Sequence, residues 1–303
     1  MHIIPDPQIP PSLLAVADNK PPEKVGIVGA GKDVVIQSVK RAFEADLLVP
    51  VFYGDTNDIK KCADDLNWDI RAFEIVQADD EHAAGHLAAM AAGRGELDML
   101  MKGQIHSDEY LKAILNKEAG LRTKERLTHV FSITFDGSEK PLLISDAAVN
   151  ATPDFTTQKS IIRNAVYVAH KLGIACPKVA FLSATETTNP HIPSSITAHE
   201  LCVWAKDNIE NALFCGPLAF DLCISPYAAK IKDITDPVAG HADIIIVPEI
   251  TVGNALLKAM VHMMGACSAG VVMGAKVPVI LTSRAAPPAA RLASVALASL
   301  VSE

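Results

Sequence analysis

Short runs of β-branched and other apolar residues alternate with longer helical patterns along most of the chain. The runs that predict strands lie at 25–28, 49–53, 74–76, 97–101, 129–134, 142–145, 178–182, 244–247, 269–272 and 277–282. Helical patterns fall between most of them, at 33–44, 81–92, 107–115, 158–172, 198–210, 254–264 and 288–300. This alternation predicts an α/β fold with mainly parallel sheets, helices on both faces and ligands at the carboxyl ends of the strands.

The length of 303 residues suits two α/β lobes better than one small core. A strand and turn at 142–153, followed by a fresh strand–helix series, marks the expected seam. We therefore expect residues 1–142 with 284–303 to form the first lobe and residues 143–283 the second.

The composition restricts the possible partners. Apolar residues make up 50% of the chain and charged residues 20%, which is enough to build a core and argues against disorder. A formal net charge of -8 argues against a nucleic acid or a membrane surface as partner. An anionic substrate must then be held by local cations and backbone amides.

Cysteine usage and the N-terminus predict a cytoplasmic enzyme. None of the six cysteines forms a C-x-x-C pair, and several lie in apolar stretches, as buried thiols of a reducing compartment do. The first residues lack the basic and apolar regions of a signal peptide. The longest apolar stretch, 266–281, contains Lys276 and Pro278 and does not predict a membrane span.

A glycine-rich turn at 26–34 follows a strand and opens a helix. It lacks the third glycine of the G-x-G-x-x-G dinucleotide motif, where Val34 stands. Gly26, Gly31 and Lys32 match P-loop spacing, but Asp33 replaces the required hydroxyl and Gly26 falls inside the strand. A tight strand–helix turn explains the pattern better than nucleotide binding.

Two histidines, His82 and His86, lie four residues apart on a predicted helix, at a spacing that suits zinc. The glutamate of an H-E-x-x-H motif is missing between them, and acidic residues at 79–81 fit the positive end of a solvated helix. No metal site is predicted.

Polar residues follow the strand at 97–101. Lys102 and Gly103 end the strand, and Ser107 can cap the next helix after His106. A solvent-exposed Lys102 beside a capped turn is one interpretation; a cation directed at a phosphate is the other.

Two later strands also end in polar residues. After the strand at 244–247, Gly253 and Asn254 at a helix start would expose N–H groups that suit a phosphate; the alternative is that Asn254 is an ordinary N-cap. After the last strand come Ser283 and Arg284, and an arginine can hold a phosphoryl group through two parallel hydrogen bonds. Their position at the strand's end favours a functional role over a surface turn.

Several blocks in the same order resemble the phosphate acetyl/butyryl-transferase family, and its butyryl branch more than its acetyl branch. The resemblance runs from about Val25 to the C-terminus and is clearest at 111–123 (LKAILNKEAGLRT), 145–153 (SDAAVNATP), 216–221 (GPLAFD), 238–243 (VAGHAD), 253–258 (GNALLK) and 282–285 (TSRA). It implies a two-lobe fold like that of isocitrate and isopropylmalate dehydrogenases, an active site in the interlobe cleft and at least a homodimer. It also implies interconversion of acyl-CoA and phosphate with acyl phosphate and CoA, without a metal or a permanently bound cofactor.

The resemblance also implies residue roles. Ser283 would contact the thiol and carbonyl oxygen, and Arg284 the phosphoryl group. Matched position adds a wider set of substrate contacts and cleft residues: Lys102, His106, Ser107, Gly253, Asn254, Lys258, and, as residues that shape the cleft, Asp146 and Asn150.

One departure from the family pattern leaves the base open. The family places a carboxylate soon after the Ser-Arg pair, but here no Asp or Glu occurs between Arg284 and Glu303, and Ala290 lies in this stretch. Glu249 or His106 could act as base, the positive site could itself hold a thiolate, or transferase activity could be weak or lost. Arg291 could indicate a different or more anionic acyl substrate.

Three hypotheses follow, in descending order: a short-chain phosphate acyltransferase acting by thiolate attack, a non-catalytic binder of CoA or acyl phosphate, and an NAD-dependent dehydrogenase of similar fold. The incomplete glycine fingerprint counts against the third.

Overall fold

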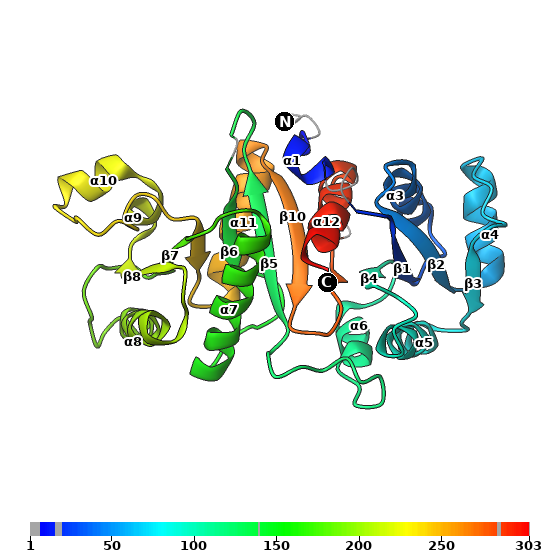
Figure 1. Ribbon diagram of the computed structural model, residues 1–303, viewed down its shortest axis with the longest axis horizontal. Coiled ribbons are helices and arrows are strands. Elements are labelled where there is room, and N and C mark those ends of the chain that lie inside the picture. The colour runs from blue at the N-terminus through cyan, green and yellow to red at the C-terminus, as the bar shows by residue number, and fades with distance from the viewer. Residues whose placement is uncertain (1–6, 16–19, 139, 284–285, 303) are drawn as a thin grey trace. The chain divides into compact units, whose positions relative to one another are not determined.

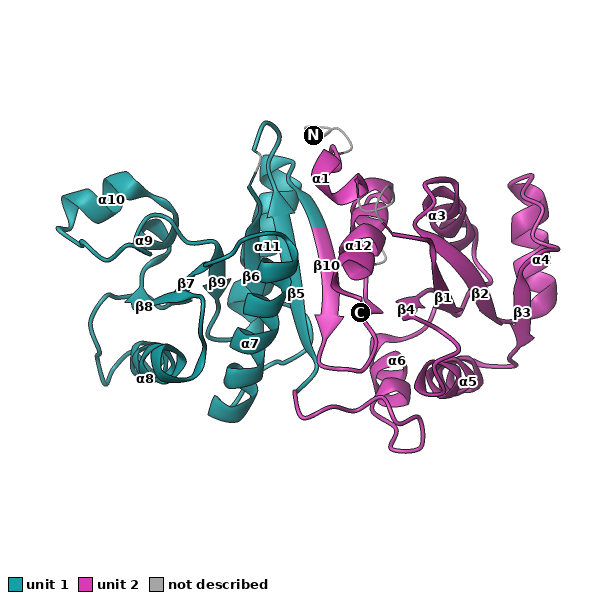
Figure 2. Cartoon of the chain, in the orientation of Figure 1, with its two compact units in different colours: residues 1–5, 126–268 teal, residues 6–125, 269–303 magenta. Residues whose placement is uncertain are grey.

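The computed structural model describes residues 7–15, 20–138, 140–283 and 286–302. The chain divides into two compact units, coloured separately in Figure 2. Unit 1 contains Arg126–Ser268, and unit 2 contains Asp6–Glu125 with Ala269–Glu303. In each unit most neighbouring strands are parallel, which confirms the predicted α/β class.

Unit 2 carries strands in the order β3-β2-β1-β4-β11-β10. Their bounds are β1 (Glu23–Val28), β2 (Leu48–Gly54), β3 (Glu74–Gln77), β4 (Met99–Lys102), β10 (Cys267–Met273) and β11 (Val279–Ile280). The strands from β3 to β11 are parallel, and β10 runs antiparallel to β11. Central residues such as Ile27, Phe52 and Leu100 are buried, as expected of a sheet covered on both faces.

The helices of unit 2 are α1 (Pro11–Leu14), α3 (Asp33–Glu44), α4 (Thr56–Asp65), α5 (Glu81–Gly93), α6 (Ser107–Ile114) and α12 (Pro288–Val301). Helices α3 and α12 lie on one face of this sheet, and α5 and α6 on the other (Figure 1). The final helix packs against α1 and α3. Lys20 fastens its end by donating to the Ser299 and Ser302 carbonyls, each at 3.0 Å.

Unit 1 carries strands in the order β5-β6-β9-β7-β8, with β5 antiparallel to β6 and the other neighbours parallel. Their bounds are β5 (Thr128–Thr134), β6 (Leu142–Ser145), β7 (Lys178–Leu182), β8 (Leu213–Leu218) and β9 (Ile244–Ile246). The helices are α7 (Phe155–Lys171), α8 (Pro193–Asn208), α9 (Phe220–Ile224), α10 (Pro226–Ile231) and α11 (Ile250–Met264). Ile144, Ile245, Leu222 and Leu257 join strands and helices in one core.

The boundaries of the compact units differ from those of the two lobes expected from the sequence. The expected boundaries lie at 142/143 and 283/284. The observed boundaries fall at 125/126 and 268/269. The first differs because β5 pairs with β6 and therefore groups with the strands that follow it. The second differs because β10 pairs with β11, which in turn pairs with β4 of unit 2.

No helix among the described residues is long and apolar enough to cross a membrane.

Candidate active site

Three neighbouring strands of unit 2 end at the same edge of its sheet. β1, β4 and β11 are parallel, with Val28 beside Lys102 and Ile280 beside Met101. Their carboxyl ends, and the loops that follow, therefore leave the sheet at the same edge. This edge carries the glycine-rich turn, the segment from Lys102 to Ser107, and Ser283.

The glycine-rich turn is packed directly against the loop after β4. Gly103 and Gln104 donate main-chain hydrogen bonds to the carbonyls of Val28 and Gly29, at 2.8 and 2.7 Å. A Cβ on Gly103 would lie 2.5 Å from the Gly29 oxygen, so only glycine allows this approach. The contact supports the interpretation of the turn as structural.

Lys102 is 5% exposed, which corrects the interpretation that places it in solvent. It is the last residue of a buried strand, and its Nζ lies 3.5 Å from the Gly103 oxygen. Burying an ammonium costs free energy unless partners compensate it. An ammonium held at a strand's carboxyl end is a natural partner for an anionic substrate.

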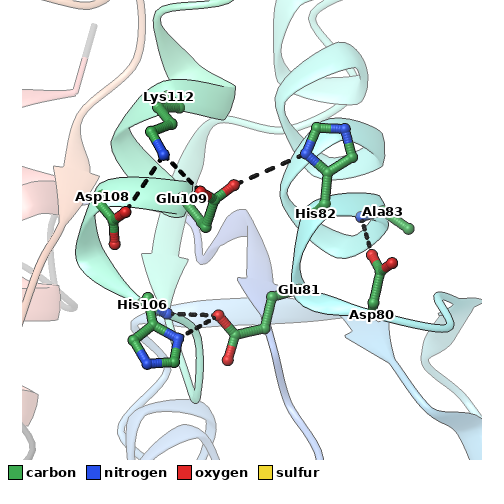
Figure 3. Close-up of polar contacts among 8 residues, drawn as sticks. All are labelled: Asp80, Glu81, His82, Ala83, His106, Asp108, Glu109 and Lys112. Carbon is green, nitrogen blue, oxygen red and sulfur yellow. Dashed lines mark hydrogen bonds and ion pairs between the residues drawn. The ribbon is translucent and has the colours of Figure 1, made fainter.

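His106 and Glu81 form a close pair at the same edge (Figure 3). Glu81 is the first residue of α5, whose N-cap Asp80 accepts a hydrogen bond from Ala83 N at 2.7 Å. One oxygen of Glu81, Oε2, accepts the His106 main-chain N–H at 2.8 Å and lies 2.7 Å from Nδ1 of the same residue. Local sequence patterns do not reveal the role of Glu81, because its partner is 25 positions away.

Ser107 does not cap α6, contrary to the expectation from the sequence. The residue at the N-cap position is His106, which makes no side-chain cap bond, and Ser107 is the first helical residue. The backbone of His106 is extended, and Glu81 holds its N–H, so the helix begins one residue earlier than a serine cap would place it.

Ser283 follows β11 and is exposed, whereas Arg284 lies outside the described residues. Arg291, in the first turn of α12, is only 5% exposed. Its Nε and one terminal nitrogen donate to the carbonyls of Ala286 and Ser283, both at 3.3 Å. Burial lowers the pKa of this guanidinium below its usual value. The described role of Arg291 is therefore to hold the chain on both sides of residues 284–285.

In unit 1, Asp146 follows β6 and is almost fully buried. Oδ1 accepts the N–H groups of Ala148 and Val149 at 2.9 and 3.0 Å. Oδ2 accepts the side-chain amide of Asn150 at 2.6 Å, and the same amide donates to the Leu127 carbonyl at 2.8 Å. Burial raises the pKa of Asp146, and these hydrogen bonds oppose that shift. Asp146 and Asn150 thus shape the loop after β6.

Glu249, and not Asn254, is the N-cap of α11, which begins four residues earlier than the sequence predicts. The two oxygens of Glu249 accept the N–H groups of Thr251 and Val252, at 2.8 and 3.1 Å. These bonds lower the pKa of Glu249, because they stabilise the ionised form. A carboxylate that holds its charge this firmly is a poor proton acceptor.

Gly253 lies within the first turn of α11, and its N–H points to the Glu249 carbonyl at 3.4 Å. A Cβ here would lie 2.9 Å from the Ala147 Cβ, so the glycine allows the helix to contact the Asp146 loop. The expectation that Gly253 and Asn254 start the helix is therefore wrong. Asn254 is also tied to this loop, through a 3.3 Å bond to the Ala147 carbonyl, and Lys258 is exposed.

His82 is exposed on α5, as the sequence predicts for a solvated face. Within the described residues, no three His, Cys, Asp or Glu side chains are grouped closely enough to hold a metal ion.

Comparison with known proteins decides the family. The sequence profile of the family described as "Phosphate acetyl/butaryl transferase" matches residues 81–299. The chain belongs to this family. Phosphate acetyltransferase of Rhizobium meliloti is 39% identical over 95% of this chain and 92% of its own length. Phosphate butyryltransferase of Clostridium beijerinckii is 35% identical over 95% of this chain and 96% of its own length. The comparisons match the two branches about equally and do not favour the butyryl one.

Solved structures agree with the expected fold. A branched-chain phosphotransacylase from Enterococcus faecalis V583 matches with a TM-score of 0.81 and 34% identity, over 92% of this chain and 99% of that one. A 4-hydroxythreonine-4-phosphate dehydrogenase from Klebsiella pneumoniae matches with a TM-score of 0.58 at 10% identity, over 93% and 100%. The latter likeness concerns the fold alone, and it confirms the dehydrogenase-like class predicted from the family resemblance.

Proposed function

We propose that this protein transfers a short acyl group between coenzyme A and inorganic phosphate. Acyl-CoA and phosphate would interconvert with acyl phosphate and CoA. Family membership carries the proposal, because the profile match spans residues 81–299 and relatives of both named activities align over 95% of the chain. The edge of unit 2 that bears Lys102 and Ser283 supports it, since it offers a buried ammonium and an exposed hydroxyl.

The proposed acyl group is butyryl-like. The support is the set of sequence blocks that resemble the butyryl branch, together with the 34% identity to a phosphotransacylase described as branched-chain. The acetyl group is the competing choice, supported by the 39% identical acetyltransferase.

The proposed chemistry is direct attack of the CoA thiolate on the carbonyl carbon of an acyl phosphate. Ser283 would donate to the carbonyl oxygen as negative charge develops there, and Arg284 would hold the phosphoryl group. Lys102 would add a second cation for the departing phosphate. Further proposed substrate contacts are Ser107, Asn254 and Lys258, with Gly253 acting only through its packing on Ala147.

The proposed setting is a cytoplasmic homodimer or higher homo-oligomer that uses CoA as a substrate and carries no permanently bound cofactor. A second candidate function is that of a non-catalytic CoA or acyl-phosphate binder. It is favoured by one observation: the sequence has no carboxylate between Arg284 and Glu303.

The test is phosphate-dependent release of CoA from acetyl-, propionyl-, butyryl- and branched acyl-CoA, followed with a thiol reagent. We expect the butyryl or branched donors to react fastest, and Arg284→Ala to lower the rate about a hundredfold or more. Absence of CoA release from every donor would exclude the transferase. Calorimetric binding of CoA without turnover would then support the non-catalytic function.

A further inference from the structure

Thiolate attack requires a group that accepts the thiol proton. A free thiol has a pKa of about 8.5 and is mostly protonated at neutral pH. The segment from Ala285 to Ser302 supplies no carboxylate for this task. We propose that Glu81 and His106 form the acid–base pair of this enzyme, with His106 Nε2 as the proton acceptor and Glu81 as the residue that orients the ring. This inference rests on the proposed function.

The contacts of Glu81 determine which ring nitrogen is available. Its Oε2 accepts the main-chain N–H of His106 at 2.8 Å and lies 2.7 Å from Nδ1 (Figure 3). An ionised carboxylate only accepts hydrogen bonds, so Nδ1 carries the hydrogen and Nε2 of the neutral ring keeps a lone pair. The His106 side chain is 64% exposed, against 37% for Glu81, which leaves the ring accessible. A carboxylate therefore fixes the tautomer that a base needs.

The pair lies on the part of unit 2 that bears the other predicted reactive residues. His106 is four residues beyond Lys102, in the loop that leaves β4. Main-chain bonds from Gly103 and Gln104 to the turn after β1 hold this loop in place. Ser283 leaves β11 at the same edge, because β11 runs parallel to β4. The loop is thus held at both ends, by the β1 turn and by Glu81.

His106 Nε2 takes the proton of the CoA thiol while the sulfur forms a bond to the carbonyl carbon of the acyl phosphate. The carbon–oxygen bond to the phosphoryl group breaks, and phosphate leaves with the bonding electron pair. The imidazolium then returns its proton to solvent or to the departing phosphate. In the reverse direction the imidazolium protonates the departing thiolate.

Another histidine–carboxylate contact on the same two helices lacks this geometry. His82 Nδ1 lies 3.8 Å from Glu109 Oε2, too far for a hydrogen bond, and the other oxygen of Glu109 binds Lys112 Nζ at 2.6 Å. Glu109 therefore provides a matched control for Glu81.

The elements around the pair carry other charged or titratable groups. They are Asp80 and His82 on α5 and its cap, Asp108, Glu109 and Lys112 on α6, Lys102 on β4, and Lys32 and Asp33 at the start of α3. Glu81 makes the shortest contact with the His106 ring that the structure records.

The experiment measures kcat/KM against pH for acyl phosphate and CoA, in the wild type, Glu81→Gln, His106→Ala and Glu109→Gln. Because His106 must be neutral, the wild type should lose activity on the acid side. Glutamine retains an oxygen that can accept the His106 N–H but removes the carboxylate that fixes the ring tautomer. We therefore expect Glu81→Gln to lower kcat about tenfold or more. His106→Ala should lose about a hundredfold or more in kcat, and Glu109→Gln should match the wild type.

Chemical rescue separates catalysis from structure. Added imidazole should restore part of the His106→Ala activity, whereas a merely structural role would leave that variant unresponsive. An active wild type with unchanged kcat in both Glu81→Gln and His106→Ala would overturn this inference alone. A wild type that releases no CoA from any donor would overturn the proposed function and this inference together.

Discussion

The two units place polar residues at the carboxyl ends of parallel strands, but they use them differently. In unit 1, Asp146 and Glu249 bind main-chain N–H groups of their own loops and helices. In unit 2, the His106 side chain and Ser283 are exposed, and Glu81 orients a ring that solvent can reach. Position at a strand's end is therefore not enough to identify a reactive group. What distinguishes the two edges is that Asp146 and Glu249 bind N–H groups of their own segments, whereas Glu81 holds an exposed ring that comes from another segment.

The largest expected effect concerns Lys102, at the edge of unit 2 that is proposed to bind substrate. Lys102→Met should lower kcat/KM for phosphate about 100- to 1,000-fold, because it removes a buried cation next to the proposed phosphoryl position. The melting temperature should change little, since methionine fills a similar buried volume without requiring a partner. Steady-state kinetics and thermal unfolding measure the two quantities. A variant with wild-type phosphate kinetics would show that Lys102 is structural, as Asp146 is.

The next largest effect concerns Asp146 in unit 1, whose contacts are structural. Asp146→Ala should destabilise the protein by about 2–3 kcal/mol, because it leaves buried N–H groups of the loop without an acceptor. Urea unfolding at neutral pH measures this change. Folded Asp146→Ala should retain most of its turnover. A variant of normal stability that has lost turnover would place Asp146 in the chemistry instead.

Close packing in unit 1 gives a smaller expected effect. Gly253→Ala should cost about 1–2 kcal/mol, because the new methyl group must enter the contact with Ala147 at 2.9 Å. Ala255→Gly, at an exposed position of the same helix, serves as the control for the difference in helix propensity. Equal stability of Gly253→Ala and the wild type would show that the helix can shift without penalty.

The smallest effect concerns pH. The pKa of Glu249 is lowered in the folded state, so its ionisation stabilises the fold above the usual value of 4.5, and this stability is lost as the pH falls through the lower folded value. Glu249→Gln keeps an acceptor oxygen but loses this dependence, and should be less stable at pH 7 by no more than about 1 kcal/mol. The difference in melting temperature between the two proteins should shrink below pH 4.5. A difference that is constant with pH would contradict the assigned cap.

The sequence predicted the α/β class well because β-branched runs and helical periodicity are local signals. It missed β8, whose segment contains Gly216 and Pro217, both typical strand breakers. The structure tolerates them because β8 lies at the outer end of the strand order of unit 1, where a missing N–H need not leave a ladder bond unmade.

The candidate site was predicted less completely, for a physical reason. Strand ends such as Lys102 and Ser283 can be found from local patterns, but the partners that determine their chemistry come from distant parts of the chain. Glu81 reaches His106 across 25 positions, and the Asp146 loop reaches Asn254 across 107. The predicted start of α11 was wrong because asparagine is a common N-cap residue and the pattern therefore favours Asn254 as the cap. The N-cap is instead the acidic residue Glu249, which lies earlier in the chain.

Arg291 gives the last helix a role in setting the position of the preceding loop. The Arg291 side chain on α12 donates hydrogen bonds to the carbonyls of Ser283 and Ala286. A rotation or translation of this helix would therefore move both residues with it. Substitutions deep in α12, remote from any substrate, can therefore alter the reach of Ser283. Directed evolution that seeks a different acyl preference has an indirect target here, because repacking α12 can tilt the loop while every substrate-facing side chain is kept.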